Sequence, residues 1–125
     1  MSSYYESTVL RSGEEAGIMV EGGVVILYAD PIPEALESVS VVHGPARGPD
    51  REIRPGDVFA IGEHRVELVA VGERAEENLR TLGHIVVYLN PAEGTQLLPG
   101  AVHGRGTMGV PDAGVPLSLR GGDTT

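Results

Sequence analysis

Histidine is the residue type in this sequence whose chemistry is tuned to neutral pH, because the chain holds His43, His64, His84 and His103 but no cysteine. A neutral imidazole can act as a nucleophile or as a base. The lack of cysteine excludes a thiolate nucleophile, disulfide bonds and a cysteine-based metal site. For each histidine the alternative is a structural role as a hydrogen-bonded residue of the fold.

His43 has the surroundings that best fit a reactive histidine. It follows the run 39–42 and precedes Gly44, so we expect it at the exposed end of a strand, where functional side chains concentrate on loops. Gly44 and Gly48 allow backbone N–H groups to approach a phosphate closely, and Arg47 can add a charge-assisted hydrogen bond. A phosphohistidine needs these features: a free ring nitrogen, donors for the phosphoryl oxygens and access for a partner.

The other histidines are candidates for supporting the phosphate or the His43 ring. His64 lies in a predicted hairpin, His84 starts a predicted strand, and His103 precedes the glycine-rich segment 104–109. The sequence predicts no metal site and no cofactor.

The elements that must position these residues are short, because 18 glycines and 9 prolines interrupt the chain. Alternating and β-branched runs predict strands, including a hairpin around residues 62–64. The predicted strands are Tyr4–Arg11, Val24–Ala29, Val39–Val42 ending at His43, Val58–Ile61, Arg65–Val71, His84–Leu89, Ala101–His103 and Pro116–Leu119.

Two short helices are predicted. Pro33 suits the first turn of a helix over Glu34–Glu37, and an apolar face at helical spacing predicts a second helix over Arg74–Leu82, ended by Gly83. The sum is mainly β: a compact barrel-like or sandwich-like single domain with one or two short helices. It is expected to occupy residues 1–125, with 119–125 as a frayed tail.

The net charge of −9 argues against nucleic acid as a partner, since phosphate backbones attract Lys and Arg. The N-terminus lacks the basic region and apolar run of a signal peptide, and no apolar stretch approaches the ~20 residues that span a bilayer. We therefore expect a cytoplasmic protein.

Several motifs together resemble the glucitol/sorbitol-specific IIA component of the bacterial sugar phosphotransferase system. The resemblance covers roughly residues 4–119 and is densest from 54 to 103. It is carried by Arg54-Pro55-Gly56-Asp57, Gly62-Glu63-His64-Arg65, Val69-Ala70-Val71-Gly72, Ala75-Glu76-Glu77-Asn78-Leu79-Arg80-Thr81-Leu82-Gly83-His84 and Leu98-Pro99-Gly100-Ala101-Val102-His103.

The resemblance implies a mainly β, barrel-like protein of the cytosol and a phosphotransferase role. Such a component accepts a phosphoryl group from the phosphocarrier HPr on a histidine. It then passes the group to the IIB component, and with it the IIB/IIC complex, for glucitol/sorbitol uptake. The family's carrier histidine stands at the end of a strand before a glycine-containing loop, and His43 alone occupies that place here.

Two other classes of protein remain open at this stage. The segment 56–64 is similar to the second motif of cupin metalloenzymes, although no His-x-His pair precedes it. The loop sequence Gly44-Pro45-Ala46 motivates a non-catalytic regulatory or binding domain of the same fold. Val- and Leu-rich strands could pair at a sheet edge to form a homodimer, and the sequence does not identify which polyol is transported.

Overall fold

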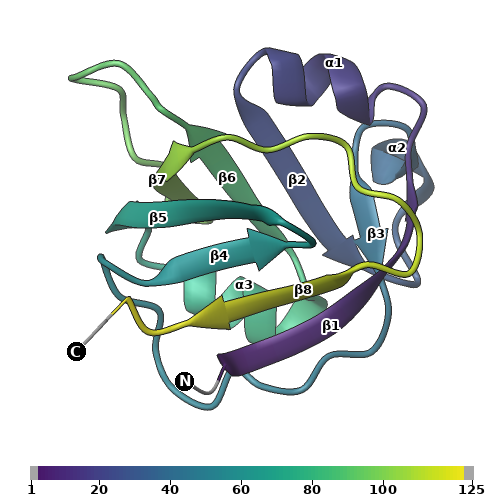
Figure 1. The fold of residues 1–125 in the computed structure, drawn as a ribbon, viewed down its shortest axis with the longest axis horizontal. Coiled ribbons are helices and arrows are strands. Elements are labelled where there is room, and N and C mark those ends of the chain that lie inside the picture. The colour runs from purple at the N-terminus through teal and green to yellow at the C-terminus, as the bar shows by residue number, and fades with distance from the viewer. Residues whose placement is uncertain (1–2, 123–125) are drawn as a thin grey trace.

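Short apolar segments separated by glycine and proline form eight strands, which close into one barrel in the computed structural model (Figure 1). The structure describes residues 3–122. In chain order the strands are β1 (Ser3–Ser12), β2 (Val24–Ala29), β3 (Val41–His43), β4 (Val58–Ile61), β5 (His64–Val71), β6 (Ile85–Leu89), β7 (Ala101–Gly106) and β8 (Pro116–Arg120).

The strands follow the order β1-β3-β2-β6-β7-β5-β4-β8 around the barrel, and β8 pairs back with β1. Neighbours are antiparallel except β2 with β3 and β6 with β7, which are parallel. Strand β3 pairs with β1 on one side and with β2 on the other, so it lies between them. This position brings the end of β3 next to residues of both neighbours.

Alternation along the strands fills the interior, as the sequence predicts. In β5, Val66 and Leu68 are fully buried while Glu67 is exposed, because successive side chains point to opposite faces of a strand. β1 repeats the pattern with Tyr5, Ser7 and Val9 turned inward. Ser7 is thus a polar residue in an otherwise apolar row.

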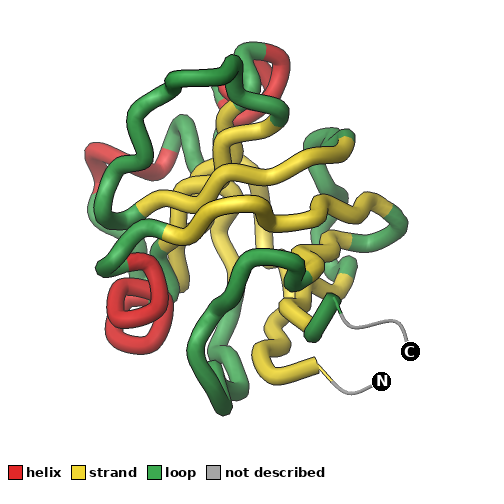
Figure 2. Tube along the Cα trace, turned by 90° about the vertical axis from the view of Figure 1, so that its left-hand side faces the viewer, coloured by secondary structure: helices red, strands yellow, loops and turns green. Residues whose placement is uncertain are grey.

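Residues 3–122 also form three short helices, which connect strands of the barrel (Figure 2). They are α1 (Ala16–Glu21), α2 (Glu34–Glu37) and α3 (Ala75–Leu82). Gly83 ends α3 in the left-handed conformation, with a φ of 64° that favours glycine. Among the described residues, no helix is long and apolar enough to cross a membrane.

The mainly β, barrel-like prediction is confirmed, and the predicted strands and both predicted helices are present. Helix α1 was not predicted, because it has only six residues and the β-branched residues Ile18 and Val20 disfavour helix. The tail begins later than expected: Leu119 is buried and Arg120 pairs with Ser3 and Val58, so both belong to β8. Residues 123–125 of the expected tail lie outside the described residues.

Closure of the barrel removes the reason given for a homodimer. That expectation depended on a free sheet edge, but each of the eight described strands has a hydrogen-bonded neighbour on both sides.

Candidate active site

His43 is the last residue of β3 and lies in register with Val9 of β1 and Ala29 of β2. Its side chain is 0% exposed, so the expectation of an exposed strand end is wrong. The cause is the end of α3, where Gly83 packs against the ring. A Cβ built on Gly83 would lie 3.1 Å from Cε1 of His43 and 2.4 Å from Cβ of Ala29.

Both ring nitrogens of His43 have hydrogen-bond partners. Nε2 lies 2.8 Å from the carbonyl oxygen of Gly83, which can only accept, so Nε2 carries the proton in the neutral ring. Nδ1 lies 2.9 Å from Oγ of Ser7, whose hydroxyl donates to it in this tautomer. The carbonyl oxygen of Gly44 lies 3.1 Å from Nδ1 and 2.9 Å from Oγ of Ser7, so it can accept from either group in the other tautomer.

The pKa of His43 is lowered from its ordinary value. Burial is the largest cause, because a low-dielectric interior disfavours the charged ring; the carbonyl groups of Gly83 and Gly44 oppose this effect. At neutral pH the ring is therefore uncharged and keeps a lone pair on one nitrogen, as a nucleophile requires.

The loop after His43 runs along β1. The N–H of Gly44 donates to the carbonyl oxygen of Thr8 (2.9 Å), and the N–H of Arg47 donates to that of Glu6 (2.8 Å). The Arg47 guanidinium pairs with Asp50 at 2.7 Å and with Glu6 at 3.4 Å, with about half of its side chain exposed. In this structure the predicted phosphate donors Gly44 and Arg47 are engaged with other groups.

Gly48, the third predicted donor of this loop, adopts a φ of +100°. A Cβ there would lie 2.1 Å from the carbonyl oxygen of Tyr4. Its glycine identity is thus explained by close packing against β1.

The other histidines are spread over the barrel. His84 directly follows Gly83; its Nδ1 donates to the carbonyl oxygen of Leu27 (2.9 Å) and its ring packs on Tyr28. His64 is exposed at the start of β5 and lines a hollow with Val110. His103 is buried in β7 and borders a different hollow. Of the three, only His84 adjoins the residues around His43.

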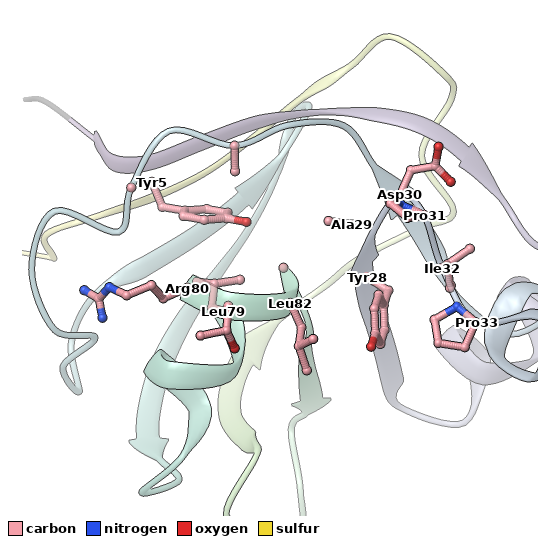
Figure 3. Close-up of a pocket in the computed structure, with 14 residues that line it drawn as sticks. Tyr5, Tyr28, Ala29, Asp30, Pro31, Ile32, Pro33, Leu79, Arg80 and Leu82 are labelled. Carbon is pink, nitrogen blue, oxygen red and sulfur yellow. The ribbon is translucent and has the colours of Figure 1, made fainter.

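A hollow of about 650 Å³ lies over the Gly83 side of His43 (Figure 3). We call it the Gly83 hollow. Its lining residues are Tyr5, Tyr28, Ala29, Asp30, Pro31, Ile32, Pro33, Ala46, Gly48, Leu79, Arg80, Thr81, Leu82 and Gly83. Leu82 is 45% exposed at its rim, and Asp30 is paired with Arg11. Figure 3 shows the Arg80 guanidinium pointing away from the centre, and it binds Glu76 and the carbonyl oxygen of Pro49.

Sequence reasoning missed Ser7 and Tyr5, which contact or face His43 from β1. The Tyr5 ring meets the His43 ring edge-on, with centroids 6.3 Å apart. Burial raises the pKa of Tyr5 to about 12. The available signal was the alternation of Tyr5, Ser7 and Val9, which places a serine in the inward row of the first strand.

No group of three or more metal-ligating side chains gathers anywhere within residues 3–122. The groups at His43 include its neutral imidazole, the side chains of Ser7 and Tyr5, and backbone carbonyls. In this arrangement the imidazole of His43 is the group that can act as a nucleophile or as a base.

This chain is similar in sequence to a known protein family. Residues 4–115 match the family model of the glucitol/sorbitol-specific IIA component of the phosphotransferase system. The glucitol/sorbitol-specific EIIA components of Shigella flexneri and of Escherichia coli (strain K12) are each 36% identical over 124 residues, covering 95% of this chain and 94% of theirs.

A solved structure shares the fold. It is the crystal structure of a phosphotransferase-system IIA component from Enterococcus faecalis V583, with a TM-score of 0.73 and 19% identity. The match covers 90% of this chain and 96% of that one. Sequence and fold together show that this chain belongs to the family of glucitol/sorbitol-specific IIA components of the phosphotransferase system.

Proposed function

We propose that residues 1–125 form a cytoplasmic phosphoryl carrier that takes a phosphoryl group from phospho-HPr on His43. It then passes the group to the IIB component of a glucitol/sorbitol transporter. The observation that carries the proposal is a neutral, buried imidazole at the end of β3, one carbonyl away from a surface hollow. Family membership supports the partners and the sugar class.

Nε2 of His43 is the nitrogen that we assign to the attack. Nδ1 is enclosed by Ser7 and Gly44, whereas the group on Nε2 is the Gly83 carbonyl, which borders the hollow. The peptide at Gly83 must turn away before phosphorus can reach Nε2. Once Nε2 is open to the hollow, it loses its proton to solvent and Nδ1 gains one, so the ring stays neutral. Nδ1 then donates to Ser7 or Gly44, and Nε2 holds the free lone pair.

The transfer itself needs no further reagent. The Nε2 lone pair forms a new P–N bond while the P–N bond of the donor's phosphohistidine breaks, and that electron pair returns to the donor's ring nitrogen. The proton on Nδ1 of His43 stays in place. A loose transition state of this kind depends mainly on positioning and on hydrogen bonds to the phosphoryl oxygens.

The surface around the site supports a protein partner. The rim of the Gly83 hollow presents Tyr28, Ile32 and Leu82, and apolar and aromatic residues are common at the centre of interfaces. The net charge of −9 would steer a partner with a basic face toward the protein.

One observation favours a second candidate, a binding domain of this fold that carries no phosphate. The His43 ring is fully covered and both of its nitrogens are bonded. A purely structural histidine has the same description.

Labelling separates the two functions. The purified protein is incubated with radiolabelled phosphoenolpyruvate, enzyme I and HPr, and the label is tested for acid lability and base stability. The carrier takes up about one phosphoryl group, His43→Gln takes up none, and His64→Gln is labelled like the wild type. An unlabelled wild type, or a fully labelled His43→Gln, would reject the carrier function.

A further inference from the structure

The hydroxyl of Tyr5 has no hydrogen-bond partner among the described residues, although it is fully buried. Tyr5 as a whole is 1% exposed. Nearly all buried hydroxyl groups in proteins have a partner, because an unpaired one loses its bonds to water without compensation. This hydroxyl therefore calls for an explanation.

Its neighbour Tyr4 shows the ordinary arrangement. The Tyr4 hydroxyl donates to the buried carboxylate of Asp57 at 2.8 Å, and Arg51 lies over the Tyr4 ring. Of these two consecutive tyrosines of β1, Tyr4 thus has a hydrogen-bonded hydroxyl, whereas the Tyr5 hydroxyl has no partner within residues 3–122.

The unpaired Tyr5 hydroxyl lies at the candidate active site around His43. Tyr5 lines the Gly83 hollow together with Ala29 and Gly83, and Figure 3 shows its hydroxyl directed toward Ala29, into the middle of the hollow. Its ring packs edge-on against His43. Tyr5 and Gly83 thus border the same hollow, and the Gly83 carbonyl is the group that covers Nε2 of His43.

We propose that Tyr5 is a catalytic residue, whose hydroxyl donates a hydrogen bond to an oxygen of the phosphoryl group as it moves to and from Nε2 of His43. The inference rests on the carrier function proposed above. The hydroxyl keeps its proton throughout, so the bonds that form and break are the two P–N bonds already described. It supplies a donor that is fixed in place beforehand, the arrangement that stabilises developing charge most effectively.

Two further observations support this role. A phenol is protonated at neutral pH, and burial raises the pKa of Tyr5 further, to about 12. Two of the three donors that the sequence suggested in the loop after His43 are occupied: Gly44 by Thr8, and Arg47 by Glu6 and Asp50. The Tyr5 hydroxyl has no such competing acceptor in the described part of the chain, so a phosphoryl oxygen would satisfy its hydrogen-bonding capacity.

The test compares Tyr5→Phe with Tyr4→Phe in the full chain. Each change removes one phenolic oxygen from adjacent residues of β1. Phosphoryl transfer from phospho-HPr is followed by rapid quench, and unfolding is followed in urea. We expect Tyr5→Phe to fold with an unfolding midpoint equal to or above that of the wild type and to transfer about 10- to 100-fold more slowly. Tyr4→Phe should show the reverse: a lower midpoint and wild-type transfer.

A second measurement works without any variant. The ¹³Cζ resonance of a tyrosine reports hydrogen bonding of its hydroxyl. We expect the Tyr5 resonance to shift when the protein is phosphorylated and the Tyr4 resonance to stay. Wild-type transfer by Tyr5→Phe, or an unchanged Tyr5 resonance in the phosphorylated protein, would overturn the role of Tyr5 and leave the carrier function standing. Failure of the carrier function itself is seen separately, as a wild type that takes up no label or as label that persists in His43→Gln.

Discussion

The carbonyl oxygen of Gly83 lies 2.8 Å from Nε2 of His43, so the end of helix α3 covers the ring nitrogen nearest the surface hollow. The two residues are 40 positions apart in the chain. Their contact shields the nitrogen that we propose as the nucleophile. The packing of Gly83 against the His43 ring can be tested by substitution.

Gly83→Ala should destabilise the protein and disturb the His43 ring. The residue has a φ of +64°, and a Cβ would lie 2.4 Å from Cβ of Ala29. We expect a loss of roughly 2–4 kcal/mol in the free energy of unfolding, from left-handed strain plus steric overlap. Urea unfolding measures the loss, and the ring signals of His43 in NMR spectra report the displacement.

Gly94→Ala is the matched control. Gly94 also has a positive φ, +88°, but a Cβ there has nothing within 4 Å. Gly94→Ala should lower the free energy of unfolding by the conformational strain alone, about 1 kcal/mol. Equal losses for the two variants would mean that Gly83 does not press against Ala29 and His43.

Ser7→Ala should change the protonation of His43. In the neutral ring the Ser7 hydroxyl donates to Nδ1 at 2.9 Å, so its removal leaves a buried acceptor without a donor. The neutral form becomes less stable, and we expect the pKa of His43 to rise and the unfolding free energy to fall by roughly 1–3 kcal/mol. Nitrogen-15 NMR of the imidazole measures both the tautomer and its titration.

Ser118→Ala provides the comparison for Ser7. Ser118 lies on the neighbouring strand β8 and lines the same hollow as Ser7, but it makes no hydrogen bond to His43 in the described structure. Its replacement should leave the titration of His43 unchanged. If both variants titrate like the wild type, the Ser7 hydroxyl does not donate to Nδ1.

The stability of the protein should fall as the pH decreases through about 6.5. Burial lowers the pKa of His43 in the folded state, so below the ordinary value the unfolded chain binds a proton that the folded chain resists. The contribution is complete above about pH 6.5 and is lost below it, by at most about 1.4 kcal/mol per pH unit. Urea unfolding between pH 8 and pH 5.5 measures this slope.

His43→Gln should show a smaller slope over the same pH range, whatever its overall stability. His64→Gln, a change at an exposed ring, is the control. The carboxylates whose pKa is lowered, such as Asp57, lose their contribution only below about pH 4, so they do not interfere. An identical slope in the wild type and in His43→Gln would contradict the lowered pKa.

The strands were predictable because their side chains alternate locally, as Val66, Glu67 and Leu68 do. Helix α3 was predictable from its apolar spacing and from Gly83 at its end. The burial of His43 was not. It depends on Gly83 and Ser7, which are 40 and 36 residues away in sequence, and no local pattern encodes a contact of that range. For the same reason the loop from Gly44 appeared free, although it pairs with β1.

Asp57→Asn tests a second long-range contact, which fixes the start of β1. Asp57 is 4% exposed. Its carboxylate accepts from the Tyr4 hydroxyl (2.8 Å), the Arg51 guanidinium (3.1 Å) and the N–H of Arg54 (2.9 Å). An amide keeps the shape but leaves Arg51 without its counter-charge. We expect the free energy of unfolding, measured in urea, to fall by roughly 2–4 kcal/mol, because removing one partner of a buried ion pair costs more than breaking an exposed pair.

Asp50→Asn is the control. It breaks an exposed pair with Arg47 and should lower the free energy of unfolding by less than about 1 kcal/mol. Similar losses for the two variants would show that Asp57 contributes no more than a surface charge.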